Sequence, residues 1–114
     1  MARPHLTPLG DLPFHILLAL GDGPAHGYAI GKDIEARTDG RLDPTTGALY
    51  QALKRLAEEG LIAPEAEPPA PSPDARRKYF ALTKAGRRAV AAEARRLESL
   101  VRAAREKKLY PASS

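Results

Sequence analysis

The run PPAPSPDA, residues 68–75, constrains the fold more than any other stretch, because it places four prolines within eight positions. Proline has no backbone N–H to donate to a neighbouring strand, so this run cannot lie inside a sheet. The flanking stretches LIAPEAE (61–67) and RKYFALT (77–83) read as short strands. We therefore expect an antiparallel β-hairpin whose long loop is stiffened by its prolines.

Apolar residues at helical spacing predict four further elements around the hairpin. The expected helices cover residues 8–20, 27–38, 44–59 and 84–109. Pro13 either bends the first helix or moves its start to Asp11, GDGPAHG (21–27) reads as a turn, and Tyr28 is expected in the core. Three helices followed by a hairpin form a winged helix-turn-helix, a mostly α fold with a small antiparallel β-hairpin.

The composition limits the class of protein. The chain has 114 residues, 43% apolar and 28% charged, which suits one domain with a modest core. No apolar run reaches the roughly 18 residues that cross a bilayer, no secretion signal is recognised, and there is no cysteine. These features indicate a cytoplasmic protein.

The charge favours a partner that carries phosphate groups, although weakly. The net charge is +4, and residues 84–108 hold nine Lys or Arg against three Glu, a surplus of six. A solvated basic helix would show the same surplus, so this segment alone does not decide between the two interpretations.

The stretch DPTTGALYQALKRL, residues 43–56, has two faces. At about 100° per residue, Leu49, Leu53 and Leu56 share one side and point to a core. The residues expected on the other side or on the flank are Thr45, Thr46, Gly47, Tyr50, Gln51 and Lys54. A small first turn lets backbone N–H groups approach phosphate, and the polar side chains can donate to phosphates or base edges. The pattern fits a DNA-reading helix, while an ordinary amphipathic surface helix remains the alternative.

Three adjacent cations, Arg76, Arg77 and Lys78, follow the proline run at the base of the predicted hairpin loop. Such a cluster is usually only solvated. Beside a DNA-reading helix, it lies where a wing would contact the sugar-phosphate backbone.

The last predicted helix carries an apolar seam. Its members, spaced as in a heptad repeat, are Val90, Ala94, Leu97, Leu100, Val101 and Ala104. A membrane-surface helix would carry large aromatic residues, which this seam lacks. We therefore expect a partner helix to cover it.

No residue pattern supports catalysis or metal binding. His5, His15 and His26 lack metal-ligand spacing, and His26 is expected to cap or pack at its helix. Glu58 and Glu59 are adjacent on one helix and point about 100° apart, so they do not form an acid/base pair. There is also no serine triad pattern and no glycine-rich phosphate loop, so we expect neither an enzyme nor a cofactor.

Three motifs in order resemble the PadR-type transcriptional regulators. They are HGYAI (26–30), TTGALYQALKRLAEEGLI (45–62) and RKYFALTKAG (77–86). The resemblance implies a winged helix domain over residues 6–83, a dimerisation helix over 84–110, and a homodimer that binds an inverted-repeat operator in double-stranded DNA. It further implies repression that a small-molecule effector relieves.

The resemblance also assigns residues to these roles. The residues that fall on the DNA-reading helix are Thr45, Thr46, Gly47, Tyr50 and Lys54, and those at the wing base are Arg76, Arg77 and Lys78. The subunit interface would use the apolar seam of the last helix with help from Leu12 and Ile16 of the first.

Two features depart from the family pattern. Gln51 stands where the family often has proline, and its side chain can reach a base edge. The proline-rich loop replaces a shorter, glycine-bearing turn. The alternative function is a winged helix that binds another protein instead of DNA, although an adaptor would usually expose apolar anchors on its third helix.

Overall fold

The computed structural model describes residues 9–65 and 78–111, and contains the predicted helices and strands in the predicted order, with one further short strand. The elements are α1 (Asp11–Ala19), a 3-10 turn η2 (Leu20–Asp22), β1 (Ala25–His26), α2 (Gly27–Arg37), α3 (Thr46–Glu58), β2 (Ile62–Glu65), β3 (Tyr79–Leu82) and α4 (Lys84–Glu106). The chain is thus mostly α-helical with a small antiparallel sheet, as expected.

Side-chain caps explain where three of the helices begin. The His26 Nδ1 atom accepts a hydrogen bond from the Ala29 amide at the start of α2 (3.1 Å). The hydroxyl oxygens of Thr45 and Thr83 accept in the same way from Ala48 and Gly86, at 3.0 Å each. Each cap satisfies an amide that has no partner inside its own helix.

The sheet has one strand more than the predicted hairpin. The strand order is β1-β3-β2, with β3 antiparallel to both neighbours; Ala25 lies opposite Phe80, and Ile62 lies opposite Leu82. The sequence predicts a turn where β1 lies, because two residues are too few to show the alternation of apolar and polar side chains that indicates a strand.

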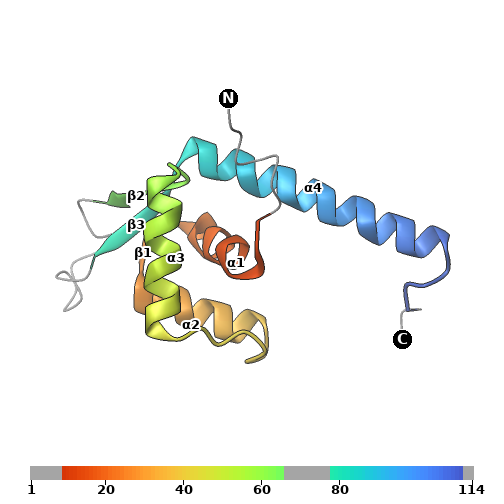
Figure 1. The fold of residues 1–114 in the computed structure, drawn as a ribbon, viewed down its shortest axis with the longest axis horizontal. Helices are drawn as coiled ribbons and strands as arrows, with labels where there is room; N and C mark the ends of the chain where they lie inside the picture. The colour runs from red at the N-terminus through yellow and green to blue at the C-terminus, as the bar shows by residue number, and fades with distance from the viewer. Residues whose placement is uncertain (1–8, 66–77, 112–114) are drawn as a thin grey trace.

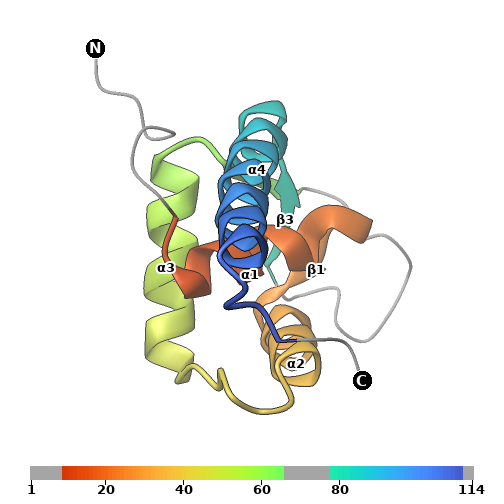
Figure 2. The same ribbon diagram turned by 90° about the vertical axis from the view of Figure 1, so that its right-hand side faces the viewer.

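The core forms around α1, which contacts α2, α3 and α4 (Figure 1). Its fully buried members include Ile16 and Leu17 of α1, Ile30 of α2 and Leu53 of α3. Figure 2, which looks nearly along α4, shows α3 at one outer edge of this arrangement. Pro13 lies in the first turn of α1, where a missing N–H is tolerated, so the helix begins at Asp11.

α4, with 23 residues, is longer than α1, α2 and α3, and its C-terminal half projects beyond the other elements (Figure 1). Among the residues that the structure describes, no helix combines the length and apolar character needed to cross a membrane.

Candidate nucleic-acid interface

α3 presents the two faces that its sequence predicts. Leu49, Leu53 and Leu56 are buried against the core. The outward residues Thr45, Thr46, Gly47, Gln51 and Lys54 are all exposed. The outer face is therefore polar, carries one lysine at its centre, and is not covered by other described parts of the chain.

The first turn of α3 is open to a large partner. The Thr45 side-chain oxygen is occupied by the cap on Ala48, while Thr46 is exposed. A β-carbon built on Gly47 would meet nothing within 4 Å. Contacts within the chain therefore do not require glycine at this position. A partner that must approach the backbone of α3 closely would favour glycine there.

Tyr50 is held against the start of α2. Its side chain is 48% exposed, and its hydroxyl lies so close to Gly27 that a β-carbon on Gly27 would overlap it. The phenol ring thus bridges α2 and α3 and fixes how the two helices of the helix-turn-helix meet.

The structure adds two residues of α2, Tyr28 and Lys32, to the candidate interface, neither of which was predicted there from the sequence. Tyr28, expected in the core, is 59% exposed, so that expectation is wrong. On a helix it lies about 160° from Ile30, which is fully buried, and this angle was readable from the sequence. Lys32 is exposed, and its Nζ atom lies 5.7 Å from the centroid of the Tyr28 ring.

A hollow of about 280 Å³ separates these residues from the first turn of α3. Tyr28, Lys32 and Tyr50 line it, together with the carboxylates of Glu35 and Asp43. Lys32 also pairs with Glu35, at 3.7 Å. The mixed charge does not select an anion inside the hollow, but its two tyrosines and its lysine extend the polar surface from α3 onto α2.

Only one of the three predicted wing cations can be placed. Lys78 is exposed just before β3, with its Nζ atom 5.6 Å from the centroid of the Phe80 ring. Arg76 and Arg77 lie outside the described residues.

The predicted subunit seam is divided by the structure. Leu97, Leu100 and Val101 are exposed on the projecting half of α4, with Ala94 exposed and Ala104 half-buried beside them. Two further members, Val90 and Leu12, pack partly against the core of the same chain.

Ile16 is a correction to the predicted interface. It is 0% exposed inside the core of its own chain and has no surface to offer a partner. An apolar helical position looks the same in sequence whether its neighbours belong to the same chain or to another one.

One carboxylate on α4 has a perturbed pKa. The hydrogen bond from the Arg96 guanidinium lowers the pKa of Glu93 below its usual value, and the Leu9 amide adds to this effect against the opposing effect of burial. Glu93 therefore stays ionised at neutral pH. In the described part of the chain, no group of three or more His, Asp or Glu side chains is arranged to hold a metal ion.

Comparison with known proteins places the fold and most of the chain in one family. The model of the transcriptional regulator PadR-like family matches residues 16–92. The crystal structure of a PadR family transcription regulator from Clostridium difficile is 25% identical, with a TM-score of 0.71 over 85% of this chain and 97% of that one.

Two other similarities are more limited. Bacillus subtilis PadR in complex with operator DNA is 24% identical, with a TM-score of 0.58 over 70% of this chain and 44% of that one, and shows a likeness of fold. An uncharacterised 37.1 kDa protein of a Streptomyces fradiae transposon is 41% identical over 90 residues. That match covers 79% of this chain but only 24% of the transposon protein.

Proposed function

Because this chain belongs to the PadR-like family of transcriptional regulators, we propose that it binds operator DNA as a homodimer and represses transcription there. The observation that carries the proposal is the outer face of α3, where Thr46, Gln51 and Lys54 are exposed while the leucines face the core. An adaptor that used α3 to bind protein would expose apolar anchors there instead.

The dimensions and chemistry of α3 fit the major groove. Its 13 residues span about 20 Å, and the groove, about 12 Å wide, admits an α-helix. The Gln51 amide can pair with the edge of adenine, and the Lys54 ammonium can donate to guanine or to phosphate. Gly47 and Thr46 let the first turn approach the DNA backbone.

Contacts beside α3 would hold the flanking phosphates. Tyr28 and Lys32 on α2 and Lys78 at the base of the wing are exposed donors. Arg76 and Arg77 remain predicted contacts of the same wing. These groups add affinity and fix register, whereas α3 supplies the sequence preference.

The projecting half of α4 would form the dimer. Leu97, Leu100 and Val101 fall within about 100° of one another on the helix and are 37, 54 and 39% exposed. Exposed apolar side chains that share one helix face mark an interaction site, and a second copy supplies a matching face. In this division residues 6–83 bind DNA and residues 84–110 join the subunits, with the α3 helices about 34 Å apart in successive major grooves.

Repression would follow from occupancy of the operator. A small-molecule effector would relieve it by acting between the winged domains and α4, because a change in the angle of α4 changes the separation of the two α3 helices.

The test is a gel shift on the DNA upstream of the chain's own gene, at two or more salt concentrations. Wild-type affinity should fall steeply with salt, and Lys54→Ala should weaken binding and reduce the log–log slope by about 0.9 if Lys54 meets phosphate. Lys107→Ala removes the same charge from an exposed position at the far end of α4 and is the matched control. No binding, or binding without steep salt dependence, would favour the protein–protein adaptor.

A further inference from the structure

α4 is attached to the winged domain first at its own beginning. The Thr83 hydroxyl donates to the Gly60 carbonyl oxygen (2.7 Å), and the Thr83 amide donates to the Leu61 carbonyl oxygen (3.2 Å). Gly86 passes so close to Leu61 that a β-carbon on it would overlap that oxygen. This joint ties the start of α4 to the end of α3.

The second attachment is a buried carboxylate on α4. Glu93 is only 6% exposed, and its Oε1 atom accepts a hydrogen bond from the backbone amide of Leu9 (3.3 Å), just ahead of α1. The Arg96 guanidinium pairs with the same carboxylate. Between the two attachments, Ala85, Ala89 and Val90 pack on the core through apolar contacts, which have no preferred direction.

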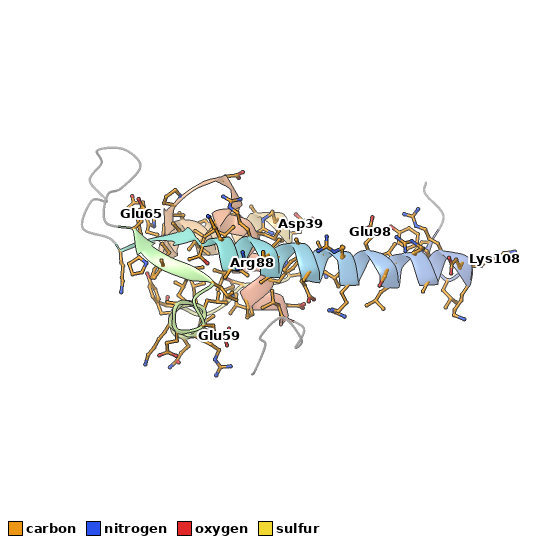
Figure 3. All side chains as sticks on the ribbon, turned by 90° about the horizontal axis from the view of Figure 1, so that it is seen from above. Asp39, Glu59, Glu65, Arg88, Glu98 and Lys108 are labelled. Carbon is orange, nitrogen blue, oxygen red and sulfur yellow. The ribbon has the colours of Figure 1, made fainter. Side chains whose placement is uncertain are left out.

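Beyond Glu93 the helix leaves the body of the fold. Figure 3, seen from above, shows Arg88 over the body and Glu98 and Lys108 beyond it. An apolar side chain would be buried at Glu93 at lower cost than a carboxylate. A hydrogen bond is directional, however, so the carboxylate favours one geometry over others.

We propose that Glu93 is a positioning residue that fixes the angle of α4 on the winged domain, and through it the separation of the two α3 helices. The second part rests on the dimeric DNA-binding function proposed above. Two attachments, at Thr83 and at Glu93, fix the direction of α4. Without the hydrogen bond of Glu93, the helix can pivot on the joint at Thr83. The helix runs about 35 Å from this pivot to Glu106, so a tilt of about 5° moves its end by about 3 Å, close to the rise of one base pair.

The angle can be measured without DNA. The chain has no cysteine, so spin labels at Ala36→Cys on α2 and Arg102→Cys on α4, both exposed positions, define one distance within a protomer. Electron paramagnetic resonance on labelled chains diluted with unlabelled ones should give a narrow distribution for the wild type. Glu93→Ala should broaden or shift it by about 3 Å. Glu93→Gln, whose amide oxygen still accepts from Leu9, should stay narrow, as should Glu98→Ala on the exposed face. An unchanged distribution for Glu93→Ala, or a Glu93→Gln distribution as broad as that of Glu93→Ala, would overturn the proposal.

The consequence for DNA is tested with duplexes from the upstream region whose centre is lengthened or shortened by one base pair. Wild type and Glu93→Gln should prefer one spacing by about tenfold, and Glu93→Ala should lose most of that preference. If Glu93→Ala keeps the wild-type preference for one spacing, the link between Glu93 and the spacing is contradicted. If the wild type binds none of the duplexes, the proposed function fails, while the distance measurement still decides the role of Glu93 in setting the angle.

Discussion

The contact between Gly27 and Tyr50 leads to a prediction in which a normally favourable substitution becomes unfavourable. Gly27 is the first residue of α2, and its φ is not positive. Replacing glycine by alanine in such a helix stabilises it by up to about 1 kcal/mol. A β-carbon on Gly27, however, would overlap the Tyr50 hydroxyl and lie 2.6 Å from its Cζ atom, so the ring must move outward.

The size of the effect follows from the exposure of the ring. A tyrosine buries roughly 200 Å², and Tyr50 is 48% exposed, so moving it outward uncovers up to about 100 Å². At about 25 cal/mol per Å² this amounts to about 2.5 kcal/mol. After the gain from alanine is subtracted, Gly27→Ala should lower the free energy of unfolding by about 1.5 kcal/mol. In a Tyr50→Ala background the same change should raise it by up to about 1 kcal/mol.

Urea unfolding of the wild type, both single variants and the double variant measures this coupling, which should be about 2.5 kcal/mol. Gly31→Ala is the matched control on the same helix, because its β-carbon would meet only Leu49 Cδ2 at 3.5 Å, an ordinary contact. Additive effects of Gly27→Ala and Tyr50→Ala within about 0.5 kcal/mol would refute the reasoning.

Three further predictions concern α4 and the caps. Leu100→Asp should weaken the dimer at least about a hundredfold, because the carboxylate would be buried unpaired, and sedimentation should then find monomers. Thr83→Ala should lower the free energy of unfolding by about 2 kcal/mol and Thr45→Ala by about 1 kcal/mol, because the Thr83 hydroxyl also donates to Gly60; equal urea midpoints for the two variants would contradict this. Because the pKa of Glu93 is lower in the folded chain than in the unfolded one, its stabilisation is present above the ordinary glutamate range and is lost as pH falls through the lowered value. Urea unfolding at falling pH should therefore show a greater loss for the wild type than for Glu93→Gln.

Local pattern in the sequence was enough to predict the four helices and the pairing of β2 with β3. Helical spacing of Leu49, Leu53 and Leu56 placed the buried side of α3 correctly, and therefore its polar side too. The helix ends moved by a few residues because caps such as Thr45 set them.

Features that depend on distant residues could not be predicted in this way. β1 exists because it pairs with β3, more than fifty residues further along the chain. Gly27 resembles any turn glycine until Tyr50 is placed against it, and Glu93 resembles any surface acid until Leu9 is found beside it. Ile16 shows the same limit, because burial within a protomer and burial between protomers call for the same side chain.

The projecting half of α4 has a consequence for how such regulators diverge from one another. Because it extends away from α3 (Figure 1), mutations there would change which chains associate and leave the selected DNA sequence untouched, if α4 joins the subunits and α3 reads DNA as proposed. If the gene were duplicated and the projecting half of α4 stayed the same in both copies, the two chains would form heterodimers that recognise operators with two different half-sites. A few charge changes along the projecting half of α4 would prevent the two copies from pairing with each other. The choice of partner and the choice of DNA sequence could then evolve separately.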